Sequence, residues 1–441
     1  MRGSASSREA RATSRATCFP RPLYVLVFSA PVGAGHDAAA AGLAVELRAA
    51  GATVDVVDGL ALLGIERLVV SAYRFQILHA AWSWRLLYRL TRSRALIRMA
   101  GTLLARLASR RLIAQLAELQ PDVVVSAYPI VSTALAGLRR RARLPQPCAT
   151  LVTDFDPHPG WIHPDLDANL VVGPAGRTTQ PISPPIPPIT MIDGTRERVR
   201  AELGIDTDQR VVLIVGGAWG VGNLEGAARA VAAAPDVHAI VVTGRNERLY
   251  RALRRDRSLG GATILGFTHR MPELMAASDL LIQNAGGLTS LEAFAAGLPV
   301  VMFDPVPGHG EDGSRLLTRA GLVATAADAP TLRMLVASES FWRTCTPDLV
   351  ARARQLFERQ SAGSAVRRLG ARPVAEPGRV RRLTPAIAVS IALGAWFIAE
   401  NPPRGYDFTA PRQPAHDAGE PANALPLATP TGLARPTAAA R

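Results

Sequence analysis

The sequence contains no lysine, so all 50 of its basic residues are arginines. This absence excludes chemistries that depend on a lysine amine, among them Schiff-base catalysis and the lysine-bearing phosphate loop. The formal charge of +14 accompanies abundant alanine, glycine and proline, a skew typical of a G+C-rich genome. Net charge is therefore a poor guide to partners, and only local clusters of arginine are informative.

Cysteine is also scarce, with three residues at Cys18, Cys148 and Cys345. An odd number at wide spacing favours neither a disulfide framework nor a zinc site. We therefore expect a protein of the reducing cytoplasm that needs no metal and no cofactor. The chain is nevertheless long, with 441 residues of which 48% are hydrophobic. That is enough to bury the cores of two domains.

Alternating strand-like and helix-like segments divide the chain into two α/β lobes. Short apolar runs alternate with helical patterns over residues 21–172 and again over 195–365, which predicts a doubly wound parallel sheet in each lobe. The proline-rich segment 173–194 is the predicted linker. Two such Rossmann-like lobes would face a central cleft at the carboxyl ends of their strands.

Both ends of the chain differ from these lobes in composition. Residues 1–20 are basic and serine-rich, without the apolar core of a signal peptide, and are expected to be a disordered tail. Residues 383–399 form an uncharged run flanked by arginines, which predicts either a transmembrane helix or a buried helix of the second lobe. Residues 401–441 are rich in proline and alanine and are expected to be disordered.

The stretch "DLLIQNAGGLTSLEAFAAGLPVVMFDPVPGHGEDG" has the strongest local pattern, a strand followed by two glycines and a helix. Gly286 and Gly287 allow close approach of the backbone to a ligand. The amides of Leu288 and Thr289 begin a helix whose positive end suits a diphosphate. Glu292, one turn later, can reach a ribose diol. An ordinary strand–loop–helix turn explains the two glycines, but less easily the whole ordered set.

Three motifs, "GGLTSLEAFAAGLP", "APVGAGHDAAA" and "VTDFDPHPGWIHP", resemble those of the family-28 glycosyltransferases. This family includes the peptidoglycan lipid-intermediate N-acetylglucosaminyltransferase and the monogalactosyldiacylglycerol synthases. The resemblance covers roughly residues 23–365. It implies the two-lobed GT-B fold, an inverting mechanism and a UDP-sugar held mainly by the C-terminal lobe.

The resemblance also implies contacts for individual residues of the second lobe. The motif "HGEDGS" places Gly313 where the family pattern has asparagine, which leaves the identity of the sugar open. The implied contacts are the diphosphate for Gly287, Leu288 and Thr289, the ribose for Glu292, uracil for the backbone around Phe267, and the sugar for His309 and Glu311.

A second glycine loop, "IVGGAWGVG", contains Gly216 and Gly217. It lacks the spacing of a dinucleotide fingerprint, and no acidic residue ends the strand that follows, so a nicotinamide site is a weak alternative. By resemblance this loop lies near the donor phosphates or the acceptor.

The segment "DFDPHPGWIHP" offers two aspartates and two histidines. Asp154 and Asp156 imitate the metal-binding motif of a different glycosyltransferase fold, but we favour structural or acceptor-site roles. His158 and Trp161 are expected at the acceptor side of the cleft. His158 and His163 also imitate a metal pair by their spacing, which we treat as the lesser alternative.

Between Glu66 and Leu112 the chain has ten arginines against one acidic residue, interleaved with aromatic residues. Rings at headgroup depth and arginines on phosphates suit the surface of an anionic membrane. The residues assigned to this surface are Trp82, Trp84, Arg85 and Arg89. The alternative is a solvated basic face with its aromatic residues in the core. Nucleic acid is not an expected partner, because no nucleic-acid-binding fold accompanies the arginines.

His36 follows the first strand in the glycine loop of Gly33 and Gly35. These glycines let the loop approach ligands, and an imidazole near its ordinary pKa accepts a proton at cytoplasmic pH. We expect His36 to be the general base that deprotonates the acceptor hydroxyl, with Asp37 or Asp154 as alternatives. A histidine satisfied by its own loop is the remaining interpretation.

Together these features predict a membrane-associated inverting glycosyltransferase at the cytoplasmic face of the plasma membrane. It would move a hexosyl or N-acetylhexosaminyl group from a UDP-sugar to a lipid acceptor, diacylglycerol-like or polyprenyl-linked. Two alternatives stay open, because a fold does not fix a function. One is a UDP-sugar epimerase of the same fold, and the other is a non-catalytic scaffold that binds UDP-sugar.

Overall fold

The structure is a computed structural model that describes four stretches of the chain, residues 21–32, 34–107, 109–186 and 194–371. The two predicted tails, 1–20 and 401–441, lie outside these residues, and so does the predicted transmembrane segment 383–399. Among the helices of the described stretches, none combines the length and apolarity needed to cross a bilayer.

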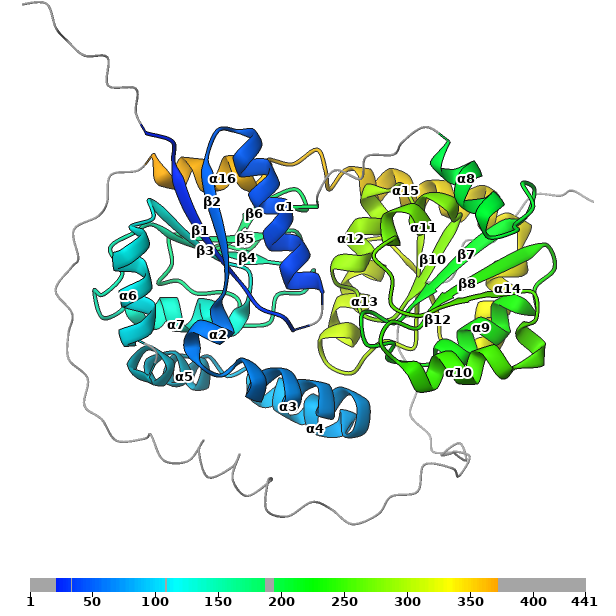
Figure 1. The fold of residues 1–441 in the computed structure, drawn as a ribbon, viewed down its shortest axis with the longest axis horizontal. Coiled ribbons are helices and arrows are strands. Elements are labelled where there is room, and N and C mark those ends of the chain that lie inside the picture. Colours follow the sequence, from blue (N-terminus) through cyan, green and yellow to red (C-terminus); the bar gives the residue numbers. More distant parts are fainter. Residues whose placement is uncertain (1–20, 33, 108, 187–193, 372–441) are drawn as a thin grey trace, which may run out of the picture. The chain divides into compact units, whose positions relative to one another are not determined.

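A six-stranded, wholly parallel sheet forms the N-terminal lobe (Figure 1). Its strands are short and mostly buried, the pattern of a parallel sheet covered on both faces. In spatial order they are β2 (Thr53–Asp58), β1 (Tyr24–Ser29), β3 (Val123–Ser126), β4 (Cys148–Val152), β5 (Ala168–Val171) and β6 (Gln180–Pro181). The edge strand β6 lies inside the predicted linker, and an edge is where a strand tolerates proline.

The helices of this lobe connect its strands, and most of them follow one another in the chain between β2 and β3. Helix α5 packs closely on α7, where a Cβ added to Gly137 would lie 2.1 Å from the carbonyl oxygen of Gly101. Only glycine permits this approach. The helices are α1 (Gly35–Ala49), α2 (Gly59–Leu63), α3 (Glu66–His79), α4 (Ala81–Leu90), α5 (Arg94–Leu107), α6 (Ser109–Leu119) and α7 (Pro129–Arg139).

The C-terminal lobe repeats this plan with a second six-stranded parallel sheet. Its strands in spatial order are β12 (Ala324–Ala326), β11 (Val300–Phe303), β10 (Leu280–Gln283), β7 (Arg210–Val215), β8 (Val237–Val242) and β9 (Thr263–Leu265). The predicted pair of α/β lobes with parallel sheets is thus confirmed.

The described residues of the C-terminal lobe also form eight α-helices, a 3-10 turn at Arg257–Leu259 and a π-helical turn at Phe341–Cys345. The helices are α8 (Thr195–Glu202), α9 (Leu224–Ala232), α10 (Glu247–Arg255), α11 (Met271–Ala277), α12 (Leu288–Ala295), α13 (His309–Arg319), α14 (Ala329–Ala337) and α15 (Thr346–Arg354).

The end of the described chain returns to the first lobe. Helix α16 (Ala362–Gly370) packs on α1, and the Gly363 amide donates a 2.7 Å hydrogen bond to the Glu46 carboxylate. The predicted end of the second lobe, residue 365, falls inside this helix. One hydrophobic core cluster includes side chains of both sheets as well as α1, α12 and α16. The two lobes are therefore joined by packing as well as by the connecting chain.

Candidate active site

His36 stands in the first turn of α1, directly beyond the carboxyl end of β1. Its ring meets Tyr128 edge-on with centroids 4.9 Å apart, and lies 5.8 Å from the ring of Trp161. The Ala127 carbonyl accepts a hydrogen bond from the ring, and Thr153 Oγ1 lies 3.4 Å from Nδ1. Burial lowers the pKa of His36, although the Asp154 carboxylate and the Ala127 carbonyl oppose this shift. The imidazole is thus oriented by its neighbours, and burial favours its neutral form.

Asp154, after β4, is the main negative charge beside His36. Its Oδ2 accepts a 2.8 Å hydrogen bond from the indole of Trp161, which fixes the carboxylate. Trp161, which the sequence assigned to the acceptor side, is only 1% exposed and packs under the site. Burial raises the pKa of the Tyr128 phenol, and the Asp154 charge raises it further. Asp37 points to a different partner, the hydroxyl of Ser29.

The opposite wall comes from the loop between β10 and α12. Gly286 has a φ of +64°, and a Cβ there would lie 3.3 Å from the Ser314 amide, so the turn requires glycine. Helix α12 begins at Leu288 without a side-chain cap. Its first amides, including that of half-buried Thr289, lack intrahelical acceptors and carry the positive end of the helix dipole. Around Gly287 there is open space.

Glu292, in the second turn of α12, is a half-buried carboxylate. Among the described residues it has no hydrogen bond or ion pair with another side chain. Desolvation by burial raises its pKa to about 7. A desolvated carboxylate of this kind accepts hydrogen bonds from a hydroxyl-bearing ligand at a neutral or alkaline pH.

These two walls meet where their strands end. A Cβ built on Gly35 would lie 3.5 Å from the Cβ of Leu288, so the first turn of α1 touches the first turn of α12. Two ion pairs connect α4 and the chain just after it to the start of α13. Arg85 pairs with Glu311, and Arg92 lies 2.8 Å from Asp312. The structure thus brings the predicted base and the predicted diphosphate site together.

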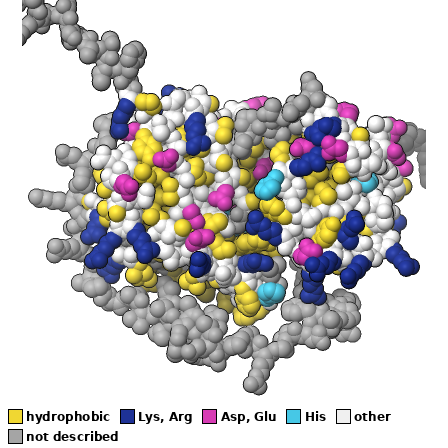
Figure 2. Space-filling model, viewed as in Figure 1, with side chains coloured by type: hydrophobic (Ala, Val, Ile, Leu, Met, Phe, Trp, Pro, Cys, Tyr) yellow, Lys and Arg dark blue, Asp and Glu magenta, His cyan; other side chains and the backbone are white. Residues whose placement is uncertain are grey.

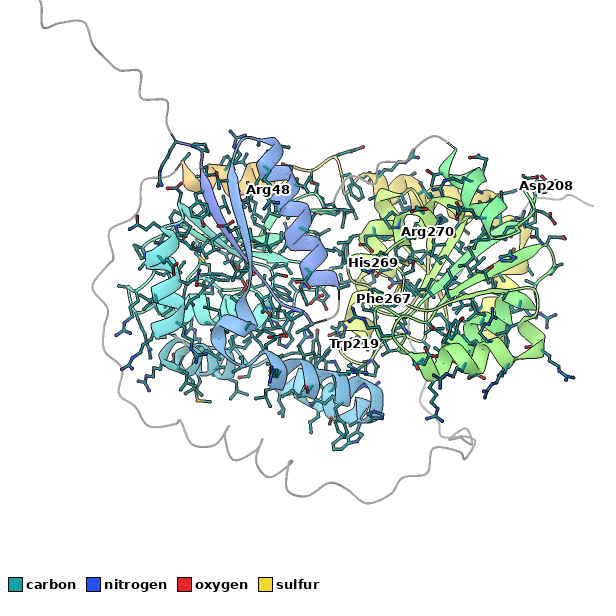
Figure 3. The ribbon with its side chains drawn as sticks, viewed as in Figure 1. Arg48, Asp208, Trp219, Phe267, His269 and Arg270 are labelled. Atoms are coloured by element: carbon teal, nitrogen blue, oxygen red, sulfur yellow. The ribbon has the colours of Figure 1, made fainter. Side chains whose placement is uncertain are left out.

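The other two loops that the sequence predicts to bind the donor follow β7 and β9. Gly217 has a φ of +68°, and a Cβ on Gly216 would lie 2.4 Å from the Val221 carbonyl oxygen, so both positions of this tight loop need glycine. Phe267 is 40% exposed, with the Arg245 guanidinium 4.5 Å above its ring. Figure 3 labels Phe267 on the same lobe as Trp219. The ring is therefore partly open to solvent beside the end of β9.

Helix α4 carries four of the predicted membrane residues on two different faces. Trp82 is 65% exposed, and Arg89 is exposed beside it. Trp84 and Arg85 instead face the second lobe, where they meet His309 and Glu311. Figure 2 shows arginine and hydrophobic side chains side by side along the lower edge of this view, where Figure 1 places α3 and α4. Half of the predicted set therefore lies on an exposed face.

Of three further predicted residues, the two histidines contact backbone carbonyl oxygens, and the glycine lies outside the residues that the structure describes. His158 Nε2 is 3.2 Å from the Tyr88 carbonyl oxygen, which ties its loop to α4. His163 is buried, with Nε2 2.8 Å from the Gly160 carbonyl oxygen. Gly33 is outside the described residues. Within the described stretches, no group of three or more His, Cys, Asp or Glu side chains is arranged to hold a metal.

The structure adds polar and aromatic residues that the motifs did not single out. Tyr128, directly before α7, touches His36, while Asn284 follows β10 and donates a 2.6 Å hydrogen bond to the Val221 carbonyl. Tyr73 of α3 lies 5.5 Å from Trp219, ring to ring, and so joins the lobes. The available signal was position, since Tyr128 and Asn284 follow the carboxyl ends of strands.

A separate depression, of about 550 Å³, lies at the other end of the second sheet. It is lined by Arg210 and Asp279, which begin or precede strands. Both already have partners, since Arg210 pairs with Glu339, and Asp279 pairs with two arginines of α8. The candidate active site is therefore the one at the carboxyl ends of the strands, where the titratable side chains and the amides of α12 lie.

Comparison with known families matches each lobe to glycosyltransferases. Residues 36–175 match the family described as monogalactosyldiacylglycerol (MGDG) synthase, and residues 195–312 match glycosyl transferases group 1. A processive diacylglycerol beta-glucosyltransferase of Bacillus cereus (strain AH187) is 27% identical over 224 residues, which cover 47% of this chain and 57% of that protein. The chain thus spans little more than half the length of such relatives. A homologue from Bacillus cereus (strain 03BB102) is 25% identical over 288 residues, covering 62% of this chain and 73% of its own.

Solved structures show the same two-lobed fold. Spinosyn rhamnosyltransferase SpnG matches with a TM-score of 0.53 and 18% identity over 79% of this chain and 100% of its own. The glycosyltransferase SnogD from Streptomyces nogalater matches with a TM-score of 0.51 and 14% identity over 79% of this chain and 99% of its own. The resemblance drawn from the motifs is confirmed, and the chain is a GT-B protein whose N-terminal lobe matches the MGDG synthases and whose C-terminal lobe matches the group 1 glycosyl transferases.

Proposed function

We propose that the protein is an inverting glycosyltransferase that moves a hexosyl or N-acetylhexosaminyl group from a UDP-sugar to a hydroxyl of a membrane lipid. The observation that carries this proposal is the contact between the first turns of α1 and α12, which places His36 opposite the uncapped amides at Leu288. The diacylglycerol glucosyltransferases among the relatives support a lipid acceptor. The soluble epimerase and the idle scaffold remain as alternatives for the experiment to separate.

The C-terminal lobe would bind the donor. The diphosphate would accept hydrogen bonds from the amides of Leu288 and Thr289, where the helix dipole favours negative charge. The ribose hydroxyls would donate to Glu292, whose carboxylate has no competing ion pair among the described residues. Uracil would lie against the backbone at Phe267, which is open on one side. These contacts hold the nucleotide before and after transfer, so they contribute chiefly to binding.

His36 would supply the proton acceptor for the chemical step. One ring nitrogen donates to the Ala127 carbonyl, which leaves the other with a lone pair. As the acceptor oxygen forms its bond to the anomeric carbon, its proton passes to this nitrogen, and the bond from that carbon to the diphosphate oxygen breaks. UDP leaves with the electron pair, and attack from the opposite face inverts the centre. The Asp154 charge stabilises the imidazolium that forms.

Helices α3 and α4 would hold the protein on an anionic membrane. Leu68, Phe75 and Trp82 are each more than half exposed, and Arg67, Arg74 and Arg89 have no carboxylate partner among the described residues. Apolar side chains that enter the headgroup layer, with arginines on lipid phosphates, give reversible surface binding. The acceptor would then reach the site from the cytoplasmic face without leaving its bilayer.

The experiment incubates the purified full chain with a panel of radiolabelled UDP-sugars and a bacterial lipid extract, and asks which lipid gains label. Transfer to lipid by the wild type, and its loss in His36→Ala with UDP affinity unchanged, supports the proposal. Interconversion of UDP-sugars without any lipid favours the epimerase. UDP-sugar binding by calorimetry with neither transfer nor interconversion favours the scaffold, and both outcomes overturn the transferase.

A further inference from the structure

Four aromatic side chains from both lobes gather beside the donor site. Tyr73 of α3 and Trp84 of α4 are edge-on with ring centroids 4.7 Å apart. Tyr73 also lies 5.5 Å from Trp219, in the loop after β7, and 6.4 Å from His309 at the start of α13. We call these four residues the aromatic box. It adjoins the ion pair of Arg85 and Glu311, so it lies where the first lobe meets the predicted sugar-binding turn.

Two nitrogens of the aromatic box are buried without a hydrogen-bond partner, Trp84 Nε1 and His309 Nδ1. Their rings meet edge-on with centroids 6.1 Å apart. A Cβ added to Gly308 would lie 3.3 Å from Trp84 Nε1, so the indole N–H lies against the turn that begins α13. Buried polar atoms are nearly always paired, and leaving one unpaired is costly. Two such atoms on neighbouring rings indicate a missing partner that can reach both rings.

The chemistry of the two nitrogens specifies that partner. An indole N–H can only donate a hydrogen bond, so it requires an acceptor oxygen. Burial lowers the pKa of His309, which keeps its imidazole neutral with one nitrogen that can accept. A hydroxyl group accepts one hydrogen bond and donates another. A hydroxyl group therefore satisfies both nitrogens at once, whichever tautomer the histidine adopts. A carbonyl oxygen only accepts, so it satisfies both nitrogens only when His309 Nδ1 carries the proton.

We propose that Trp84 and His309 jointly bind one hydroxyl group of the sugar carried by the donor, so that helix α4 of the first lobe selects a UDP-hexose. This inference rests on the proposed function. The rings of Tyr73 and Trp219 complete the aromatic box around that hydroxyl. Trp84 is then a specificity residue contributed by the lobe opposite to the one that holds the nucleotide.

The test is a double-change cycle that combines a substitution in the protein with the removal of one hydroxyl group from the sugar. Transfer to lipid extract is measured for wild type and Trp84→Phe with a UDP-hexose and with its analogues that each lack one ring hydroxyl. A site that hydrogen-bonds a hydroxyl discriminates strongly against its loss. We expect one deoxy analogue to lose roughly 10–100-fold in kcat/KM with wild type. Trp84→Phe should lose a similar factor with the parent hexose and nothing further with that same analogue.

Trp342→Phe is the matched control, since this tryptophan lines the depression at the other end of the second sheet and should leave every analogue's ratio unchanged. If Trp84→Phe instead lowers kcat/KM by the same factor for the parent hexose and for every deoxy analogue, the two nitrogens share a structural water, and the inference is overturned. Calorimetric binding of the same sugars without lipid gives the same cycle without turnover. The subsite can thus fail while transfer succeeds, and a protein that binds UDP-hexoses without transferring them contradicts only the proposed function.

Discussion

The two lobes share one architecture but expose different surfaces. In the first lobe, exposed large apolar side chains concentrate on α3 to α5, whereas among the described residues of the second lobe only Phe267 and Met334 are of this kind. Those on α3 to α5 are Leu68, Phe75, Trp82, Leu86, Leu87, Leu90, Leu96, Leu103 and Leu107. These nine exposed large apolar side chains on three successive helices exceed the scattered single residues that need no explanation.

Arginines are used differently in the two lobes. Several arginines of the second lobe pair with carboxylates of the same lobe, as Arg200 does with Asp279 and Arg270 does with Glu273. On α3 and α4, Arg67, Arg74 and Arg89 lack such partners among the described residues. Arginine content alone therefore does not identify a binding surface. What separates a solvated face from a binding face is whether carboxylates already neutralise its arginines.

The chemistry is divided in the same way. In the proposed site, His36 and Asp154 of the first lobe surround the reacting atoms, while the second lobe offers the amides of α12 and the desolvated carboxylate of Glu292. On this division, substitution of His36 changes turnover, substitution of Glu292 changes nucleotide affinity, and substitution of the exposed arginines of α3 and α4 changes membrane binding. Each experiment below can break that division.

The largest effect is expected for His36→Ala. Removal of a general base costs about 10²–10⁴-fold in turnover, while UDP affinity should stay within error because the nucleotide contacts belong to the second lobe. Turnover at saturating lipid and calorimetric UDP affinity are measured together. His238→Gln, at the amino end of β8, is the control and should change neither. Near-normal turnover in His36→Ala would transfer the role to Asp154.

Glu292→Ala tests the other half of the division. Loss of hydrogen bonds from both ribose hydroxyls to a carboxylate should weaken UDP binding by about 1.5–3 kcal/mol, or ~10–150-fold in Kd. Turnover at saturating donor should change far less. The control is Glu247→Ala, an exposed glutamate paired with Arg251 on the same lobe. Equal UDP affinity in wild type and Glu292→Ala would remove the ribose from this site.

Membrane binding should distinguish the two arginine sets. Arg74→Gln with Arg89→Gln removes two unpaired charges from α3 and α4, each worth about 1 kcal/mol near an anionic surface, so vesicle affinity should fall ~30-fold. The same change of charge at two paired arginines of the second lobe, Arg229→Gln with Arg251→Gln, should have little effect. Sedimentation with phosphatidylglycerol vesicles measures both, and added salt should shrink the difference. Equal losses in the two variants would mean that net charge alone binds the membrane.

Sequence patterns predicted the lobes because the period of apolar residues depends on local geometry, which a single chain segment already displays. The glycine turns were equally readable, since a positive φ as at Gly286 leaves a residue signature. The sequence selected His36 from its place in the glycine loop after the first strand, and Glu292 from its place one turn after the glycine pair and from the family resemblance.

Other features depended on contacts between distant segments and were not readable. The sequence assigned Trp84 and Arg85 to the membrane with Trp82, because helix periodicity defines faces but does not tell which neighbour covers each. In the structure Trp84 and Arg85 face α13 of the second lobe. The return of α16 to the first lobe is likewise a tertiary contact over a long stretch of chain. The altered pKa of Glu292 follows from burial, which no local motif encodes.

The smallest effect, and the one most specific to the second lobe, is the pH dependence of donor binding. Burial raises the pKa of Glu292 to about 7, above its ordinary value, so in the free protein the carboxyl group is largely protonated below that pH and ionised above it. The ribose hydroxyls donate to the ionised form, and affinity should therefore rise as pH increases from about 6 to about 8, by up to roughly tenfold. UDP-glucose is the suitable probe, because its diphosphate is a diester that keeps its charge across this range. In Glu292→Gln the amide does not titrate, and calorimetry should show a flat profile at the lower affinity. A wild-type profile as flat as that of Glu292→Gln would contradict the prediction, and a rise of the same size in both proteins would assign the pH dependence to a group other than Glu292.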